Sequence, residues 1–428
     1  MSVPVVNVRD SCRGCGSREI VGCVPLAPVP IVSPNVSPTA EISKSEGVVA
    51  PLDTYLCRDC GLIQLVHVVD PALLYRQYLY RTSISTGLPE HFQALAEKLV
   101  EEQSLGPNAF VVEFGSNDGT FLQAFKQLGM RVLGVEPASA IAAAAEARGV
   151  PTLEAFFGEQ LAQKIVADSG QAELVVANNV FANIDDLDDV VRGLKTLLSK
   201  QGAFVFETQY ALDVFERFLL DVIYHEHLST FSVRSTKALF ERFDMELFDA
   251  KRIETKGGSI RIWVQHRGGP HPIAARVGDL IKLEHESGLF DPARLSRFSD
   301  RVETTRDALL RIVDGVRGKG GTVAAYGTSV GCAALIHHFD LTSRLSFFLD
   351  DTPFKDELRG PGYRLPVFSG DGVVQHDPDL IIILAWRYAD AIVSKHQAYL
   401  RGKGRFVIPL PEVHQVPQPV DAFAPAMP

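Results

Sequence analysis

Residues 108–139 read NAFVVEFGSNDGTFLQAFKQLGMRVLGVEPAS, and this stretch decides the fold. Apolar side chains from Phe110 to Phe114 predict a buried strand, and the apolar spacing in TFLQAFKQLG predicts a helix that ends at Gly129. A second buried strand, RVLGVE, ends in the acid Glu136. Strand, glycine turn, helix and strand in this order indicate the first half of a doubly wound α/β sheet, whose ligands bind at the carboxyl ends of the strands.

The turn GSNDG, residues 115–119, favours S-adenosylmethionine (SAM) over a dinucleotide such as NAD. It lacks the GxGxxG spacing that lets backbone amides close on a pyrophosphate. Glu113 and Asp118 would repel a pyrophosphate but suit the ammonium group of a methionine moiety, and Glu136 is placed to accept both ribose hydroxyls. The predicted cofactor residues here are Glu113, Gly115, Ser116, Asn117, Asp118, Gly119 and Glu136.

The same alternation continues over residues 172–210, AELVVANNVFANIDDLDDVVRGLKTLLSKQGAFVFETQY, as strand, polar turn, helix and strand. We expect Asn178 and Asn179 to face the adenosine side of the cofactor, although turn formation or helix capping would explain both asparagines equally well. Two further strands, MELFDAKRIET and SIRIWVQH, are joined through KGG and predict an antiparallel edge of the sheet.

Four cysteines form two CxxC pairs, CRGCG and CRDCG, each followed by a glycine. The glycine fits a turn that needs positive φ and directs backbone amides toward the thiolates. Four thiolates form the closed ligand set of a structural Zn²⁺ site. We therefore predict zinc at Cys12, Cys15, Cys57 and Cys60, with reduced surface thiols or a redox CxxC as alternatives, and interpret Cys23 as a small buried thiol.

The loop DVIYHEHLSTFS, residues 221–232, brings a tyrosine, two histidines and a glutamate together. HEHLS does not match the zinc-binding pattern HExxH, because Ser229 stands at its fifth position, so a metal role is disfavoured. An acid/base site and an ordinary polar loop remain as interpretations. His225 is expected to be structural.

The whole chain has 428 residues, 46% of them hydrophobic, which predicts a globular protein of two or three domains. A net charge of −10 argues against nucleic acid as a partner. The lack of a long apolar run or basic leader argues against a membrane segment or secretory signal, so a cytoplasmic location is expected.

The C-terminal third repeats the pattern of strand, glycine turn and helix in KGGTVAAYGTSVGCAALIHHFDL, which predicts a second Rossmann-like α/β unit. Asp350 and Asp351 follow its next expected strand, but one such turn is weak evidence for a nucleotide site. We predict a zinc-binding module at residues 1–75, a class I SAM methyltransferase domain at 76–312, a Rossmann-like domain at 313–415 and a disordered tail at 416–428.

These motifs together resemble a known family. The cysteine pairs, EFGSNDGTFL, GVEPA, NNVFANIDDL, YHEHLSTFS and KGGSIRIW stand in the order found in zinc-containing, SAM-dependent C-methyltransferases of nucleotide-linked keto-deoxy-sugars. The resemblance runs from Cys12 to about Glu412. It implies methylation of the carbon next to a ketone, in antibiotic or surface-glycan pathways, with a small-molecule acceptor.

The resemblance also implies roles for the YHEH loop. Tyr224, Glu226 and His227 would handle the acceptor, with His227 or Glu226 as general base, and either Tyr78 or Tyr80 would join them. Removing a proton next to a ketone needs such a base, and histidine titrates nearest neutrality. Tyrosine hydroxyls would stabilise the developing oxyanion.

Four positions depart from the family pattern on the acceptor side, where relatives carry other residues: Asn183, Lys256, Gly331 and Cys332. The cofactor residues are kept while these change, which predicts a retained methyl donor and leaves the acceptor open. A methyltransferase for another metabolite, a non-catalytic SAM-binding module and an NAD-dependent oxidoreductase are the alternatives.

Overall fold

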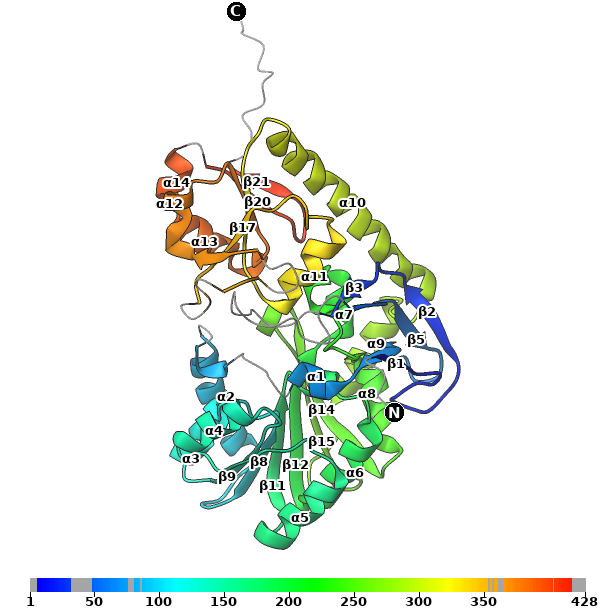
Figure 1. Ribbon diagram of the computed structural model, residues 1–428. Helices are drawn as coiled ribbons and strands as arrows, with labels where there is room; N and C mark the ends of the chain where they lie inside the picture. The colour runs from blue at the N-terminus through cyan, green and yellow to red at the C-terminus, as the bar shows by residue number, and fades with distance from the viewer. Residues whose placement is uncertain are drawn as a thin grey trace, which may run out of the picture. The chain divides into compact units, whose positions relative to one another are not determined.

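The computed structural model describes residues 6–31, 48–75, 81–84, 87–352, 355, 358–360, 365–402 and 404–417 (Figure 1). Internal contacts divide the chain into two compact units. The first comprises Met1–Val24, Asp53–Glu216 and His225–Leu295, and the second comprises Pro25–Leu52, Arg217–Tyr224 and Ser296–Pro428. Tyr78 and Tyr80 lie outside the described residues, as does the tail from residue 418 onward.

The first unit contains a seven-stranded sheet in the order β10-β9-β8-β11-β12-β15-β14. Its strands from β10 to β12 run parallel, and β15 and β14 complete the sheet antiparallel, as the sequence predicts. The strands are β8 (Phe110–Phe114), β9 (Arg131–Val135), β10 (Thr152–Leu153), β11 (Ala172–Asn178), β12 (Leu198–Gln209), β14 (Met245–Ile253) and β15 (Ser259–His266).

Helices flank both faces of this sheet (Figure 1). They are α2 (Leu88–Glu102), α3 (Thr120–Gln127), α4 (Ser139–Ala147), α5 (Glu159–Ser169), α6 (Leu187–Leu197), α7 (Ala211–Glu216), α8 (Val233–Glu241) and α9 (Ala275–Glu286). Residues of α2 and α3 form one buried core with Val111, Val176, Val205 and Trp263 of the sheet. Alternation along each strand sends the neighbouring side chains, such as Phe204 and Phe206, into an aromatic cluster on the other face.

The zinc module adds a four-stranded antiparallel sheet in the order β13-β6-β5-β2 to the same unit. The strands are β2 (Ile20–Val24), β5 (Thr54–Cys57), β6 (Ile63–Leu65) and β13 (Ser229–Thr230); β1 (Val6–Val8) pairs with β7 (His67–Val69), and α1 (Pro71–Tyr75) follows. β13 comes from the chain directly after YHEH, so this loop is tied to the module by strand pairing.

The second unit contains a six-stranded sheet in the order β18-β17-β16-β19-β20-β21, in which only β21 is antiparallel among the described strands. This is the predicted second Rossmann-like domain. Its strands are β16 (Val323–Tyr326), β17 (Phe347–Asp350), β18 (Val367–Ser369), β19 (Leu380–Ile383), β20 (Phe406–Ile408) and β21 (His414–Val416). Val416, expected in the tail, thus belongs to a strand.

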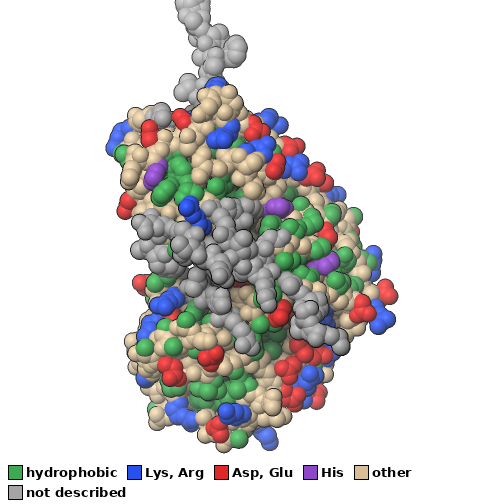
Figure 2. Space-filling model, viewed as in Figure 1, with side chains coloured by type: hydrophobic (Ala, Val, Ile, Leu, Met, Phe, Trp, Pro, Cys, Tyr) green, Lys and Arg blue, Asp and Glu red, His purple; other side chains and the backbone are tan. Residues whose placement is uncertain are grey.

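The remaining elements of the second unit are mostly helical. They are β3 (Val29–Pro30), β4 (Val49–Ala50), α10 (Pro292–Arg317), α11 (Val330–His338), α12 (Val373–His376), α13 (Ala389–Lys395) and α14 (Gln397–Arg401). On the face shown in Figure 2, the visible Lys and Arg side chains of described residues are interspersed with Asp and Glu. Among the described helices, none is long and apolar enough to cross a bilayer.

Candidate active site

A cavity of about 580 Å³ lies in the first unit, at the carboxyl ends of β8, β9 and β11. This is the edge at which parallel α/β sheets bind their ligands. Five of the predicted cofactor residues line it: Gly115, Asn117, Glu136, Asn178 and Asn179. The lining continues to the end of β7 and the residue after it, from Val68 to Asp70, and to Tyr75 in α1.

The turn after β8 requires a residue without a side chain at Gly115. Gly115 has φ of 64°, and a Cβ there would lie 2.6 Å from a methyl carbon of Val180. Asn117, with φ of 50°, turns its backbone N–H toward Glu136 and donates to Oε2 at 3.0 Å. The chain therefore passes close to the cavity with no bulk at Gly115.

Glu136 stands directly after β9, and its carboxylate is fixed from two sides. Besides Asn117, the N–H of Ala138 donates to Oε1 at 2.9 Å. Burial raises the pKa of Glu136, while these two backbone N–H groups act in the opposite direction. Each oxygen keeps a second lone pair, which fits the two vicinal hydroxyls of a ribose.

Four of the predicted cofactor residues, Glu113, Ser116, Asp118 and Gly119, are not among the described lining residues of this cavity. Burial raises the pKa of Glu113 well above the usual range of a carboxyl, and a hydrogen bond with Asn178 offsets only part of this. Asp118 accepts hydrogen bonds from Thr120 Oγ1 at 2.6 Å and from the N–H of Ser83 at 3.1 Å. Asp118 therefore braces the turn from within the protein.

Aromatic residues that the sequence analysis did not single out also line the cavity. Phe156 and Phe157 follow β10, and the ring of Phe157 stacks on Phe114 with centroids 4.8 Å apart. Phe156 is 45% exposed, which is unusual for so large an apolar side chain next to a cavity. Phe156 follows the edge strand β10, which is only two residues long. No periodic pattern in the sequence therefore marks Phe156 as a cavity residue.

This set of groups fits SAM. The turn without bulk at Gly115 admits the methionine moiety, Glu136 offers two carboxylate oxygens to the ribose, and Phe156 and Phe157 offer apolar faces to an adenine. Asn178 lines the cavity at the end of β11, where its side-chain amide can bond a polar ligand atom. When bound, SAM supplies an electrophilic methyl group.

We expect Glu136→Gln to weaken binding of S-adenosylhomocysteine by about 10-fold to 100-fold, because hydrogen bonds to a charged group contribute about 1.5–3 kcal/mol. Isothermal titration calorimetry measures this. Since burial raises the pKa of Glu136, the wild-type affinity is also expected to fall on acidification earlier than for an ordinary carboxyl. Glu154→Gln is the matched control. Glu154 is exposed and follows the neighbouring strand β10, so this change should leave the affinity unchanged. Equal affinities for the wild type and the Glu136 variant would remove Glu136 from the cofactor site.

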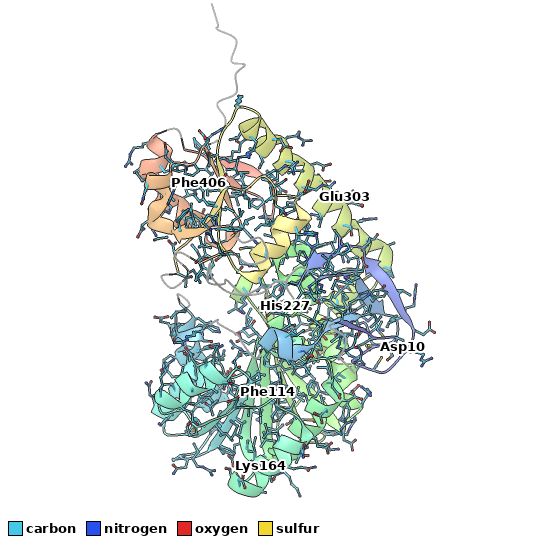
Figure 3. All side chains as sticks on the ribbon, viewed as in Figure 1. Asp10, Phe114, Lys164, His227, Glu303 and Phe406 are labelled. Carbon is cyan, nitrogen blue, oxygen red and sulfur yellow. The ribbon has the colours of Figure 1, made fainter. Side chains whose placement is uncertain are left out.

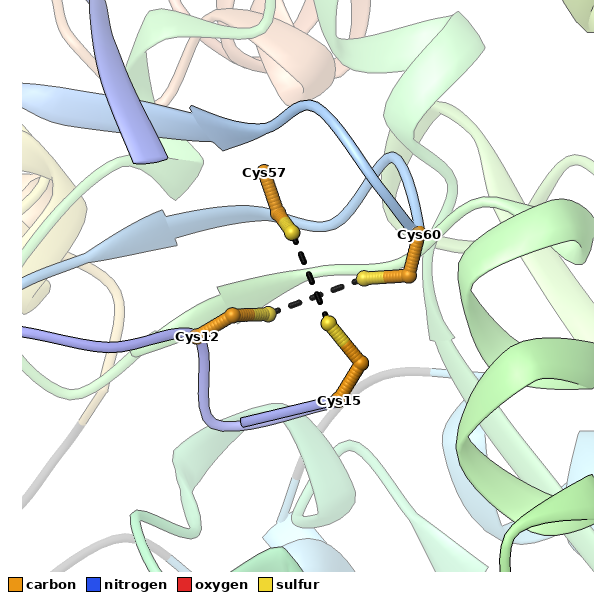
Figure 4. A group of neighbouring side chains, drawn as sticks. All are labelled: Cys12, Cys15, Cys57 and Cys60. Carbon is orange, nitrogen blue, oxygen red and sulfur yellow. Dashed lines mark hydrogen bonds between the residues drawn. The ribbon is translucent and has the colours of Figure 1, made fainter. Parts of the chain in front are cut away.

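The four predicted zinc ligands converge (Figure 4). Their sulfur atoms all lie within 4.8 Å of one another, with Cys12 and Cys60 Sγ 3.6 Å apart and Cys15 and Cys57 Sγ 3.5 Å apart. Tetrahedral Zn²⁺ with bonds of about 2.3 Å spaces its sulfur ligands at about 3.8 Å, so the cluster fits the ion. Gly16 and Gly61 close the two turns with φ of 78° and 80°, as predicted.

One residue inside the first turn of the zinc cluster reaches the YHEH loop. Arg13 is buried and donates from its guanidinium to the carbonyl oxygens of Leu65 at 2.7 Å and Leu228 at 2.5 Å. Burial lowers its pKa to about 10, although the carboxylate of Asp185 nearby acts in the opposite direction. Arg13 thus fastens the end of the loop to the metal-binding turn.

His227 lies at the centre of Figure 3 and is half-buried. The side-chain nitrogen of Gln209, at the end of β12, lies 3.0 Å from its Nδ1 and 2.9 Å from its Nε2. The other amide atom of Gln209, Oε1, accepts from Thr208 Oγ1 at 3.0 Å, which directs the NH₂ group toward the imidazole.

The other residues of the loop differ in burial. Glu226 is 6% exposed and its backbone oxygen accepts a hydrogen bond from the Tyr75 hydroxyl at 3.2 Å. Tyr224 is half-buried. His225, expected to be structural, is 5% exposed and lines the cavity together with Leu228. Glu226 and His227 are not among the described lining residues.

The four departures from the family pattern fall in two places. Asn183 and Lys256 line the cavity of the first unit. Gly331 and Cys332 lie in α11 of the second unit, where a Cβ on Gly331 would stand 2.3 Å from the carbonyl oxygen of Asp221. A lysine at 331 would therefore clash with the backbone.

The acids after β17 serve the second unit itself. Asp350 accepts from the N–H of Thr328 at 3.0 Å and the N–H of Thr352 at 2.9 Å, and it pairs with Lys355 at 3.0 Å. Burial raises the pKa of Asp350, but Lys355 and these hydrogen bonds outweigh it and the pKa is lowered. Asp350 is therefore largely satisfied within the protein.

The fold and the two ligand sites define a zinc-containing, SAM-dependent methyltransferase, and comparison with known proteins agrees. Family models match residues 12–75, described as "Putative zinc binding domain", residues 88–249, described as "Methyltransferase domain", and residues 254–411, described as "C-methyltransferase C-terminal domain".

The C-methyltransferase NovU of Streptomyces niveus is 33% identical to the chain over 409 residues, which cover 95% of this chain and 97% of NovU. The chain belongs to this family of C-methyltransferases. Solved structures also match in part. A SAM-dependent methyltransferase from Anabaena variabilis matches with 17% identity and a TM-score of 0.34, covering 41% of this chain and 84% of its own. The PH0226 protein of Pyrococcus horikoshii matches with 13% identity and a TM-score of 0.36, covering 44% and 95%.

Proposed function

We propose that the enzyme transfers the methyl group of SAM to the carbon next to a ketone of a nucleotide-activated deoxy-sugar, through a base-generated enolate. The acceptor class comes from the motif resemblance described above, since NovU is named only as a C-methyltransferase. One observation carries the proposal most directly. The cavity with the cofactor residues continues to polar side chains on the acceptor side, namely Asn183, His225 and Lys256.

In this proposal His227 is the first candidate for the base and Glu226 the second. Histidine titrates nearest neutrality among the side chains of the loop, and the side-chain nitrogen of Gln209 lies within 3.0 Å of the His227 ring, where it can orient the imidazole. Tyr224 and one tyrosine of the segment with Tyr78 and Tyr80 would donate hydrogen bonds to the oxygen of the acceptor. The predicted division of the chain at residues 75 and 312 remains part of the proposal.

Methyl transfer is tested by mass spectrometry after incubation with SAM and a panel of TDP-, GDP- and UDP-linked 4-keto-deoxy-sugars. We expect one member to gain a single methyl group, and proton NMR should place it on the carbon next to the ketone. A methyl group on oxygen, or no gain on any member while S-adenosylhomocysteine still binds, would contradict the proposal.

The second candidate is a SAM-dependent methyltransferase for a different small molecule, acting on carbon or oxygen. The favouring observation is that Asn183 and Lys256, both departures from the family pattern, line the cavity. Asn183 Oδ1 is buried and has no hydrogen-bond partner among the described residues, so it suits an acceptor with a hydrogen-bond donor at that position.

A further inference from the structure

The lining of the cavity is mostly uncharged, and its charged side chains are acidic apart from one residue; among the acids, Asp185 is paired with Arg9 and Arg13. Its described lining includes five carboxylates, Asp70, Glu136, Asp185, Asp186 and Asp189, and Lys256 is the one Lys or Arg among those lining residues. Carboxylates suit the cationic sulfonium of SAM, but they oppose any negative charge that develops on an acceptor. Lys256 is therefore placed to meet such a charge.

The backbone at Lys256 is strained, and a glycine at this position would have no such strain. Lys256 has φ of 52° and ψ of 27°, the left-handed conformation, which is strained for a residue other than glycine. Gly257 and Gly258 follow directly, so this turn already uses glycine where it needs positive φ. Lys256 therefore stands at a position that glycine would fill without strain.

The turn that carries Lys256 is firmly held. It joins β14 to β15, and Ser259 Oγ donates to the carbonyl oxygen of Thr255 at 2.8 Å. A Cβ on Gly258 would stand 2.5 Å from Cβ of Asp213, a fully buried residue that accepts hydrogen bonds from Nε of Arg252 at 2.9 and 3.1 Å. The turn is therefore anchored through Thr255 and Gly258, and Lys256 between them is exposed and lines the cavity.

We propose that Lys256 is a catalytic residue whose ammonium group binds the enolate oxygen of the acceptor, a role that rests on the proposed function. In the deprotonation step the C–H bond next to the ketone breaks and its proton goes to the base, His227 or Glu226. The electron pair of that bond forms the C=C bond of the enolate, and the carbonyl π pair moves onto the oxygen. The ammonium of Lys256 stabilises this oxygen more than the neutral carbonyl, which lowers the barrier.

The test separates enolisation from methyl transfer. A TDP-4-keto-6-deoxyhexose is incubated in D₂O with enzyme and S-adenosylhomocysteine, and NMR follows deuterium uptake next to the ketone. Lys256→Met is expected to lower the uptake rate and kcat with SAM by about 100-fold or more, as for loss of one oxyanion-stabilising group. The KM of the acceptor and the affinity for S-adenosylhomocysteine should change less than about 3-fold, since these report ground-state binding.

Three controls decide the interpretation. Lys256→Arg keeps the charge and should retain more activity than Lys256→Met. Lys256→Asn suits the left-handed backbone and should fold at least as well as the wild type while being as slow as Lys256→Met. Lys282→Met, on the exposed face of α9, should be fully active.

Two outcomes overturn the inference, and they are distinguishable. Lys256→Met could raise only the KM of the acceptor and still exchange deuterium at the wild-type rate when the acceptor is saturating. The lysine would then bind an anionic group of the unreacted acceptor and have no part in enolisation. If the wild type itself exchanges no proton with any ketone of the panel, the proposed function fails, and the oxyanion role fails with it.

Discussion

Replacing His227 by glutamine is expected to lower kcat of methyl transfer by about 100-fold to 10,000-fold, the range typical for loss of a general base. Glutamine has a similar size and hydrogen-bonding capacity but does not accept a proton at neutral pH. Binding of S-adenosylhomocysteine should be unchanged, because the groups assigned to the cofactor, such as Glu136 and Asn178, lie on other segments. Steady-state kinetics and calorimetry measure the two effects.

Glu226→Gln, made in parallel, decides between the two candidate bases. The base is the residue whose loss abolishes deuterium uptake by the acceptor, whereas a residue that only orients the base should leave a slow exchange. His285→Gln, at an exposed residue of α9, is the control for histidine replacement and should be fully active. A His227→Gln variant with full activity on its acceptor would rule out His227 as the base.

Loss of the zinc ion is expected to abolish methyl transfer as well as the fold of the module. Structural Zn²⁺ sites contribute an apparent binding free energy of about 10–16 kcal/mol, which adds to the burial of a small set of apolar side chains in the module, such as Leu56 and Ile63. Cys57 ends β5, which pairs with β6, and β6 pairs with β13 directly after YHEH. Arg13, between Cys12 and Cys15, donates to Leu228 next to the same loop.

Cys57→Ser should therefore lose the bound zinc, lower the unfolding temperature and reduce methyl transfer by at least about 100-fold. Elemental analysis, thermal unfolding and kinetics check these results. Cys23→Ser is the matched control, because Cys23 is buried in β2 against Thr54 and stands apart from the four-cysteine cluster; it should keep one zinc per chain. A zinc-free Cys57→Ser protein with wild-type activity would show that the module does not support the loop.

The fold of the first unit could be predicted because the sequence motifs that indicate it are short and local. The buried strand Phe110–Phe114, the glycine turn and the acid Glu136 follow one another within one βαβ unit, and each has a direct counterpart in the structure. The cysteine pairs were equally readable, because spacing within each pair and the following glycine define the ligand turn. Two strand-like segments joined through KGG also predicted the antiparallel edge formed by β14 and β15.

Which side chains face the cavity was less predictable, because this depends on packing between segments far apart in the sequence. Asp118 stands in the predicted cofactor turn, yet its carboxylate accepts bonds from Thr120 and Ser83 inside the protein. Phe156 lines the cavity from a short irregular segment after β10, where no periodic pattern marks an apolar residue as a ligand contact. The pairing of β13 with β6, which ties the YHEH loop to the zinc module, joins residues more than 160 positions apart.

Among the positions that depart from the family pattern, one is explained only by long-range packing and one was partly visible in the sequence. Gly331 has a local steric cause, the carbonyl oxygen of Asp221, which no sequence pattern reveals because η3 (Leu220–Val222) lies more than 100 residues earlier. Lys256 was visible in the sequence as an unusual residue before two glycines, but its left-handed backbone and its place in an acidic cavity come from the structure.

The most direct test of the account is deuterium exchange by the wild-type enzyme, held with S-adenosylhomocysteine so that no methyl group is available. An enzyme that works through an enolate should exchange the proton next to the ketone of its acceptor with D₂O, with one deuterium per molecule seen by NMR, and His227→Gln should suppress the exchange. Methyl transfer to an acceptor whose proton next to the ketone never exchanges under these conditions would contradict the enolate mechanism.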